Sequence, residues 1–466
     1  MADSLKKSMA IWVMFLLTVF CGSVILAQDD DDGGGDTVIA MDQGYAGIAI
    51  DANHVLSVKT YQEPSLQTLR MRQMTAAQQL PKDLREYTPA RAVSLTRLER
   101  EIAQANGVLS DEIRYMAGLQ KIDHVLVYPE TGDVVLVGPA EGWYKDITGR
   151  VVGLTTGRPV LRLEDMVAAM RVYAPQSREA KVIGCSIDPT QEGLARMQQF
   201  LQRVGRTARP GDTMAIVNGL RESLGLQMVR IDGVAPETHF AQVLVEADYR
   251  MKLMGIGLER IPVKGMKSFV ATASPSQVSR NALFRWYFVP EYECVRMSPD
   301  QLAISLEGQG VKLIGADEMV SRDGSRQSAS SGDRASRAFT EGFTKNYEKI
   351  AAATPVYAEL RNLIDMSVVA AYMQETDVYG KLDWELVYFG SEERFPIATY
   401  RAPTHVASAV NAIWKGRTLM TPIGGGVEIF AKRALKQENL LSANDGKTKE
   451  VHQNLHQNLP ENGWWW

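Results

Sequence analysis

The stretch HVLVYPETGDVVLV, residues 124–137, decides the fold class. His124–Tyr128 and Val134–Val137 are rich in β-branched residues, and the Pro, Gly and Asp between them are typical turn residues. Two such runs joined by a short turn predict an antiparallel hairpin.

Similar short runs surround this hairpin, and helical patterns separate them irregularly. Strands are expected at 45–50, 55–58, 181–187, 227–231, 241–247, 286–289, 293–297, 302–306, 311–314, 384–389 and 418–429. Helices are expected at 94–104, 110–119, 189–204, 214–224 and 355–372. Frequent hairpins without regular strand–helix alternation favour an α+β fold. We expect mixed, mainly antiparallel, hairpin-rich sheets with packed helices in two subdomains.

The N-terminal sequence has the pattern of an export signal. Lys6 and Lys7 precede an apolar run over 9–20, and cleavage is expected after Ala27, which makes 1–27 a signal peptide. Ile25 is larger than the small residue usual three positions before a cleavage site, so an uncleaved membrane anchor is the alternative. The predicted location is therefore periplasmic or extracellular.

Composition divides the rest of the chain into six further segments. These are an acidic Gly-rich tether (28–36), an N-terminal strand pair and linker (37–92), an α+β domain (93–320), a disordered Ser/Arg insert (321–336), a C-terminal helix-plus-strand subdomain (337–436) and a disordered tail (437–466).

Charge and hydropathy exclude some partners. The 466 residues are 45% hydrophobic, and the net charge is −4. Five aspartates lie in 28–36, so the remainder is close to neutral and lacks the basic stripe that nucleic acid requires. No second apolar run reaches the roughly 18 residues of a membrane span, so membrane contact is expected only if the N-terminal segment is uncleaved.

Cysteine and histidine give no metal site. Cys185 and Cys294 remain after removal of the signal segment, and they form either one disulfide or two buried thiols. No histidine lies at ligand spacing from either cysteine, so neither a metal nor a cofactor is predicted.

Two pairs of carboxylates are the candidate catalytic residues. Glu246 and Asp248 end the strand expected at 241–247, and Glu291 and Glu293 repeat the spacing after Pro290. Residues two apart on a strand share a face, and two nearby carboxylates can divide the acid and base roles of glycoside hydrolysis. They can also bind a hard cation such as Ca²⁺.

The structural alternative is charge pairing. Arg250, Lys252, Arg280 and Arg285 lie near enough in sequence to neutralise these acids. Other catalytic motifs fail, because the chain has no G-x-S-x-G elbow and Gly424–Gly426 lacks a following Lys-Ser/Thr.

Several long segments together resemble a family of exported bacterial proteins from planctomycetes that carry a domain of unknown function. They are GLQKIDHVLVYPETGDVVLVGPAEGW (118–143), HFAQVLVEADYRMKLMGIGLE (239–259), RWYFVPEYECV (285–295), TEGFTKNYEKI (340–350), YAELRNLIDMSVVAAYM (357–373) and IWKGRTLMTPIGGGVEI (413–429). The resemblance spans roughly 95–435 and implies a bacterial source, export and one extended module. It implies no catalytic or binding residue.

The sequence therefore predicts a noncatalytic binding or structural component of the bacterial cell envelope. Its expected partner is an envelope protein or a glycan. The alternative is an extracytoplasmic hydrolase, acting on glycans through the paired carboxylates.

Overall fold

A computed structural model describes most of the chain after the first 44 residues. The described residues are 45–62, 64–177, 182–204, 209–273, 282–315, 318–320, 326–328, 334–411, 414–415, 418–419, 423–442 and 446–466. The expected signal peptide and acidic tether lie outside them, as does most of the expected insert at 321–336. No helix within these ranges is both long enough and apolar enough to cross a membrane.

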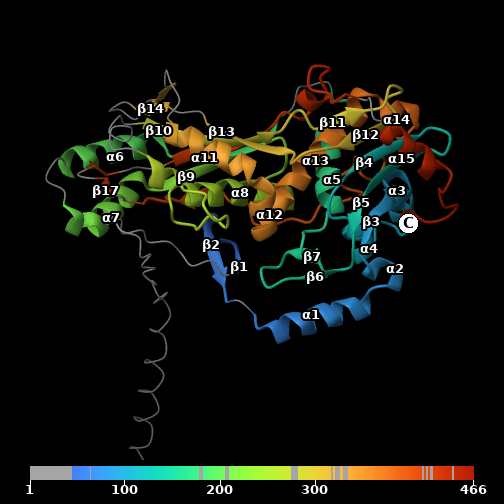
Figure 1. The fold of residues 1–466 in the computed structure, drawn as a ribbon, viewed down its shortest axis with the longest axis horizontal. Helices are drawn as coiled ribbons and strands as arrows, with labels where there is room; N and C mark the ends of the chain where they lie inside the picture. The colour runs from blue at the N-terminus through green and yellow to red at the C-terminus, as the bar shows by residue number, and fades with distance from the viewer. Residues whose placement is uncertain are drawn as a thin grey trace, which may run out of the picture.

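Helices and strands alternate irregularly along the described chain (Figure 1). The strands are β1 (Tyr45–Ile50), β2 (Val55–Tyr61), β3 (Thr88–Ser94), β4 (His124–Tyr128), β5 (Asp133–Ala140), β6 (Trp143–Lys145), β7 (Val151–Gly153), β8 (Ile183–Asp188), β9 (Leu226–Asp232), β10 (Ala282–Pro290), β11 (Val295–Met297), β12 (Ala303–Leu306), β13 (Val311–Gly315), β14 (Glu318–Val320), β15 (Arg326–Ser328), β16 (His405–Ala407), β17 (Trp414–Lys415), β18 (Thr418–Leu419) and β19 (Ile423–Ile429). The helices are α1 (Leu66–Gln79), α2 (Lys82–Arg85), α3 (Leu95–Gln104), α4 (Asp111–Arg114), α5 (Leu163–Val172), α6 (Gln191–Val204), α7 (Thr213–Leu224), α8 (His239–Gly255), α9 (Phe269–Thr272), α11 (Arg334–Lys345), α12 (Tyr347–Ala353), α13 (Pro355–Glu375), α14 (Val378–Lys381) and α15 (Lys447–His456), with 3₁₀ turns at Met116–Gly118, Pro210–Asp212 and Ala431–Leu435. The expected α+β class is confirmed.

The hairpin that opened the sequence analysis forms the centre of an antiparallel sheet. β4 and β5 pair with Tyr128 opposite Asp133, and Gly132 takes the positive φ of 68° that the turn requires. The five strands lie in the order β11-β12-β4-β5-β3. Every residue of β5 is buried, as expected for a strand covered on both faces.

A second, mixed sheet carries the helices of interest. Within the described residues it has the order β1-β2-β16-β9-β8-β19-β10-β14-β15, with β13 also paired to β10. The long helix α8 packs on β8 and β19, and α13 packs on α8 and α5. One apolar core runs through both sheets, from Leu56 of β2 to Trp464 near the C-terminus. The charged residues on the facing sides of α8 and α13, Glu246, Arg250 and Glu359 among them, are therefore buried.

The strand expected at 241–247 is wrong, because these residues lie within α8. The Thr238 hydroxyl caps the helix by accepting the backbone N–H of Ala241 at 3.2 Å. Every residue of α8 from Val243 to Gly255 is buried. A helix surrounded by protein shows no clear polar face, so its sequence loses the 3.6-residue period that would identify it.

The hairpin expected across Gly308-Gln309-Gly310 is also wrong. β12 pairs with β11 and β4, whereas β13 pairs with β10 in the other sheet. Gly308 and Gly310 both have a φ of 70°, a conformation that glycine adopts without strain. The glycines therefore turn the chain from one sheet into the next.

Residues 384–389 do not form the expected strand, because 384–386 have no regular structure and 387–389 belong to a turn. The buried carboxylate of Glu99 accepts the backbone N–H groups of Tyr388 at 2.7 Å and Phe389 at 2.8 Å, and the indole N–H of Trp384 at 2.5 Å. A carboxylate that collects neighbouring N–H groups favours a turn over a ladder.

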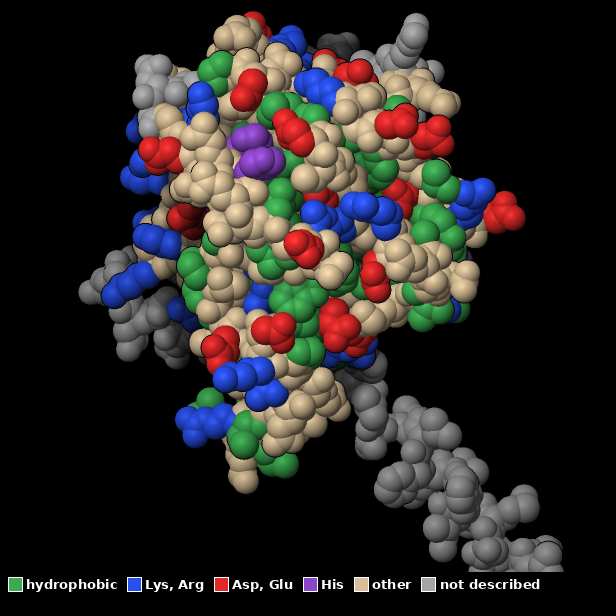
Figure 2. All heavy atoms as spheres, turned by 90° about the vertical axis from the view of Figure 1, so that its right-hand side faces the viewer, with side chains coloured by type: hydrophobic (Ala, Val, Ile, Leu, Met, Phe, Trp, Pro, Cys, Tyr) green, Lys and Arg blue, Asp and Glu red, His purple; other side chains and the backbone are tan. Residues whose placement is uncertain are grey.

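The tail expected to be disordered instead covers the five-stranded sheet. Residues 446–466, which we call the C-terminal strap, contain α15 and lie on the outer face of the sheet, where Val451, Leu455, Leu459 and Trp466 pack on a small apolar cluster that includes Leu126 and Tyr128. Figure 2 shows this side of the molecule, with acidic and basic side chains interspersed among small apolar areas.

Backbone hydrogen bonds join the C-terminal segment to both edge strands of the five-stranded sheet. Leu441, just before the strap, donates its N–H to Val295 of the edge strand β11 at 2.8 Å. At the opposite edge, Ala92 of β3 and Trp466 exchange hydrogen bonds of 2.9 and 3.0 Å. Unpaired sheet edges invite association with other chains, and here both edges are covered.

We predict that Leu455→Asp destabilises the protein by about 1.5–3 kcal/mol, because the substitution removes an apolar contact with the sheet. It is also expected to increase self-association, because release of the strap exposes the β3 edge. Urea unfolding and size-exclusion chromatography with light scattering measure the two effects. The control is Gln453→Asp, which places the same charge on the exposed face of α15. Equal stability of the two variants would contradict a packed strap.

Candidate functional site

The candidate site is a chain of buried ion pairs between α8 and α13. Glu246 and Arg250 lie one turn apart on α8, with Glu246 Oε1 at 3.4 Å from Arg250 Nη1. Glu246 is only 3% exposed. The acid that was expected at a solvated strand end is therefore neutralised inside the protein.

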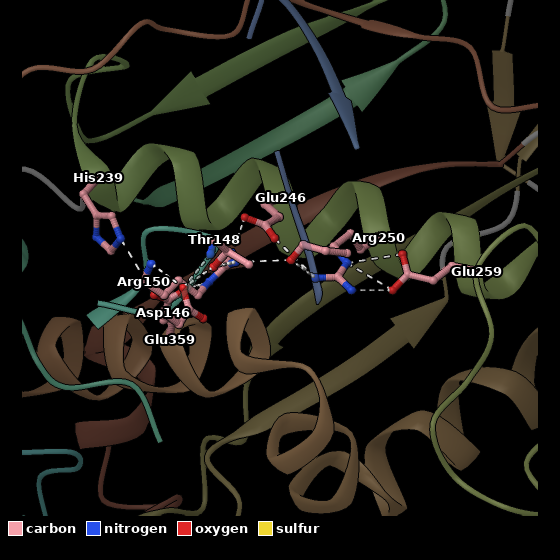
Figure 3. Close-up of polar contacts among 9 residues, drawn as sticks. Asp146, Thr148, Arg150, His239, Glu246, Arg250, Glu259 and Glu359 are labelled. Carbon is pink, nitrogen blue, oxygen red and sulfur yellow. Dashed lines mark hydrogen bonds and ion pairs between the residues drawn. The ribbon is translucent and has the colours of Figure 1, made fainter. Parts of the chain in front are cut away.

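Arg150 links the two helices. Its Nη2 donates to Oε2 of Glu246 on α8, and its Nε donates to Oε2 of Glu359 on α13 at 2.9 Å. Figure 3 shows this guanidinium between the two helices. Burial alone would lower the pKa of Arg150, but the two carboxylates outweigh it and raise the pKa. Arg150 in turn holds the pKa of Glu359 below its ordinary value, against the effect of burial.

A tight loop before β7 places Arg150 in this position. Asp146 Oδ1 accepts the backbone N–H of Thr148 at 2.8 Å and that of Arg150 at 3.0 Å, and it also accepts the Thr148 hydroxyl at 2.7 Å. Gly149 takes a φ of 88° within the same turn. An Asp that accepts N–H groups a few residues further on, followed by a glycine with positive φ, fixes the turn through local contacts.

Contacts between titratable side chains continue in both directions along α8. Toward its C-terminus, Arg250 Nη2 lies 2.8 Å from Glu259 Oε1. Toward its N-terminus, His239 Nδ1 lies 2.8 Å from Asp165 Oδ2, and His239 Nε2 lies 3.9 Å from Glu359 Oε1. The buried charges therefore satisfy one another in one network.

A cavity of about 350 Å³ opens beside the network, and we call it the arginine cavity. Its walls include Arg150, Arg250 and the polar side chains of Tyr144, Asp146, Thr148 and Thr156. Arg150 Nη1 and Arg250 Nη1 each lie 3.4 Å from the carbonyl oxygen of Ala46, which also lines the cavity. Arg150 Nη1 also lies 3.4 Å from Thr148 Oγ1, and Arg250 Nη1 also lies 3.4 Å from Glu246 Oε1. All four contacts are long and therefore weak, so a ligand at the cavity wall can compete for these donors.

Asp248 belongs to a separate buried pair. Its Oδ2 accepts from Lys252 Nζ at 2.7 Å, and the same ammonium donates to the carbonyl oxygens of Ile187 and Gly425 at 3.0 and 3.2 Å. Residues two apart on a helix point to different sides, so Glu246 and Asp248 do not share a face. Burial raises the pKa of Asp248 to about 6, although Lys252 opposes the rise.

Glu291 and Glu293 lie elsewhere, beyond the end of β10. They line a cavity of about 360 Å³ with Tyr292, Lys312, Glu428 and Arg433, and neither Glu246 nor Asp248 lines it. The two predicted carboxylate pairs therefore do not share this cavity.

The cysteines remain apart. Cys185 on β8 and Cys294 after β10 are both buried free thiols, so the disulfide alternative is wrong and the buried-thiol alternative is correct. Burial raises the pKa of both thiols, to about 12 for Cys294. Within the described residues no three His, Cys, Asp or Glu side chains are arranged to hold a metal ion.

Sequence reasoning found the partners on α8 and missed those from elsewhere. Arg250 and Lys252 were named as partners, and they do pair with Glu246 and Asp248. Arg285 was also named, but its Nη2 lies 2.9 Å from Asp188 Oδ2, and Arg280 lies outside the described residues. The spacing of four between the members of each pair was the available signal, and it becomes visible only once the segment is assigned to a helix. The sequence around Arg150 and around Glu359 does not predict their ion pair, because neighbouring residues in the sequence do not determine which helix each side chain contacts.

Comparison with known families gives one match. Residues 185–269 match the model of a family described as a protein of unknown function (DUF1598). The match runs from β8 to the start of α9 and contains Glu246, Asp248, Arg250 and Glu259. No curated protein and no solved structure matches the chain.

We predict that Arg150→Met destabilises the protein by about 3–5 kcal/mol, because Glu246 and Glu359 lose a buried counter-ion. Arg158→Met is the control, since Arg158 is exposed on the following turn, and a change within about 0.5 kcal/mol is expected. Urea unfolding measures both. If the free energy of unfolding of Arg150→Met were less than about 1 kcal/mol below that of the wild type, Arg150 would not be the ion-pair bridge between α8 and α13.

The Asp248–Lys252 pair gives a pH-dependent prediction. A carboxyl group whose folded-state pKa is raised contributes stability below its unfolded pKa of about 3.9, and that stability is lost as pH rises through about 6. Asp248→Asn has no carboxyl group to titrate at this position. Between pH 4 and 7, the free energy of unfolding of the wild type should therefore fall relative to that of the variant. Urea unfolding at several pH values measures the difference. Asp83→Asn, at an exposed position, should run parallel to the wild type, and a parallel Asp248→Asn curve would refute the assignment.

Proposed function

We propose that this protein is an exported, noncatalytic binding protein of the bacterial cell envelope and that it holds a sugar unit of a glycan in the arginine cavity. The observation that carries the proposal is the pair of buried guanidinium groups that line a cavity of about 350 Å³. Export rests on the N-terminal sequence pattern.

The lining of the cavity suits a hydroxylated ligand. Arg150 and Arg250 supply donors, Asp146 supplies an acceptor, and Tyr144 and Thr148 supply hydroxyl groups. Arg150 is fixed by Glu246 and Glu359, so little side-chain freedom is lost when a ligand binds. A preorganised polar wall of this kind supports specific binding of a small polar group.

The state of the acids supports binding rather than hydrolysis. Glycoside hydrolysis needs one carboxyl group that gives up a proton and a second that receives or attacks. Glu246 is held by Arg150 and Arg250, and Asp248 is fully buried against Lys252. Neither of them lines the arginine cavity.

The binding proposal predicts that a bulky side chain at the cavity mouth abolishes ligand binding. Ala353 lines the cavity at the end of α12 and is exposed, so Ala353→Trp blocks the space without changing an ion pair. We expect at least a tenfold loss of affinity for a glycan identified on an array of envelope polysaccharides, measured by isothermal titration calorimetry. Lys349→Trp, on the exposed face of the same helix, should bind as the wild type does.

Two outcomes would contradict the proposal. Unchanged affinity in Ala353→Trp would place the ligand elsewhere. Failure of every glycan to bind, together with concentration-dependent self-association, would favour a structural component of the envelope.

A hydrolase site, if the protein has one, lies in the cavity beyond the end of β10. Glu291, Glu293 and Glu428 line one cavity together, so this cavity holds the carboxylates that the reaction would need. If the purified protein releases reducing sugar from a glycan and Glu291→Gln, Glu293→Gln or Glu428→Gln stops the release, the protein is a hydrolase and the noncatalytic proposal fails.

A further inference from the structure

A groove between α1 and β6 extends the candidate site. Its volume is about 580 Å³, and its lining includes Arg72 and Gln79 of α1 with Tyr144 and Lys145 of β6. Tyr144 also lines the arginine cavity, so the groove and the cavity share a wall. In Figure 1, α1 lies along the lower edge of the molecule, beneath β6 and β7.

Local contacts hold α1 in this place. The hydroxyl of Ser65 caps the helix by accepting the N–H of Thr68 at 3.2 Å, and Gln73 Nε2 donates to the Leu154 carbonyl at 3.0 Å. Thr68, Arg72, Thr75 and Gln79 recur at three and four residues and therefore form one stripe along the groove. Yet no residue of α1 is buried, so the packing of the core does not explain why the helix lies there.

The charges along the groove have one sign. Arg72 and Lys145 line it, and Asp146, in the cavity, is the one acid among the residues that line either space. Arg150 and Arg250 also line the cavity, but Glu246, Glu259 and Glu359 already pair with them, so the excess of positive charge lies along the groove. The Oδ1 atom of Asp146 accepts two backbone N–H groups, which partly neutralise it. α1 itself carries Arg70 and Arg72 and no carboxylate. This polarity differs from the near-neutral balance of the chain after residue 36.

We infer that the ligand is an acidic polysaccharide, with one sugar unit held through its hydroxyl groups in the arginine cavity and the anionic groups of the following units in the groove beside α1. This inference rests on the proposed function and names the class of glycan. Arginine pairs well with carboxylate and sulfate groups, and hydroxyl-bearing side chains between the cations match the hydroxyl groups of a sugar chain. An acidic peptide is less suitable, because the α1 wall offers side chains and the β6 edge opposite is only 3 residues long, which gives a peptide backbone little to pair with.

The experiment uses uronic acid oligomers of one to six units, with methyl-esterified oligomers of the same length as uncharged probes. Affinity for the full-length wild type, measured by calorimetry, should rise at least tenfold from one unit to four and should fall with added salt. The uncharged oligomers should show little gain with length. In Arg72→Ala/Lys145→Ala the affinity for a single unit should be retained, and the gain with length should disappear.

The matched control is Arg70→Ala. It removes the same charge from the same helix at a position that does not line the groove, and it should keep the gain with length. Circular dichroism and melting temperature would confirm that the double variant is folded, as expected for exposed positions.

The possible failures are distinguishable. If single units bind and Ala353→Trp abolishes their binding, but affinity does not grow with length, the sugar-binding proposal stands and the acidic-chain inference fails. If charged and uncharged oligomers bind equally, the inference also fails. If an oligoglutamate binds as tightly as the uronic acid oligomers and depends on Arg72 and Lys145 to the same degree, the groove takes acidic peptides and the polysaccharide assignment is wrong. If no oligomer binds, both proposals fall.

Discussion

The buried guanidinium of Arg150 is the interaction on which the rest of the structure depends. It ties a loop before β7 to α8 through Glu246 and to α13 through Glu359, so three segments far apart in sequence meet at one charge. A buried charge is tolerated only when it is paired, and a carboxylate that loses its partner costs several kcal/mol. This requirement fixes the spacing of the two helices more narrowly than apolar packing alone, because ion pairs depend on direction as well as on volume.

The same requirement shapes the candidate site. Glu246 on α8, Glu359 on α13 and Glu259 just after α8 fix the orientation of Arg150 and Arg250, and both arginines line the arginine cavity. Acids that serve as counter-ions are not available as proton donors, and this favours binding over catalysis. The groove beside α1 adds Arg72 and Lys145 next to the cavity, across the wall that Tyr144 shares, and this supports the proposal of a ligand that occupies both spaces.

The five-stranded sheet obeys a different constraint. A sheet with two free edges and an apolar outer face is open to association, and the C-terminal strap covers the face and reaches the β3 edge. Arg97 fastens the strap by donating to the carbonyl oxygen of Pro460 at 2.5 Å while it binds both oxygens of Asp133 at the hairpin turn. The hairpin that decides the fold class thus also positions the C-terminus.

Much of the fold follows from local sequence. The β4–β5 hairpin, the helix opened by Pro355 and the β8–α6 unit were predicted because their periods, turns and caps lie within a few residues of one another. Sequence alone could not identify α8, since a helix buried on all sides has no polar face, and it could not separate β12 from β13, which pair in different sheets. The candidate site divides in the same way. Glu246 with Arg250 is a local pair that the sequence contains, whereas Arg150 and Glu359 meet it only through folding, because the partner of a buried charge is chosen by tertiary proximity and not by spacing along the chain.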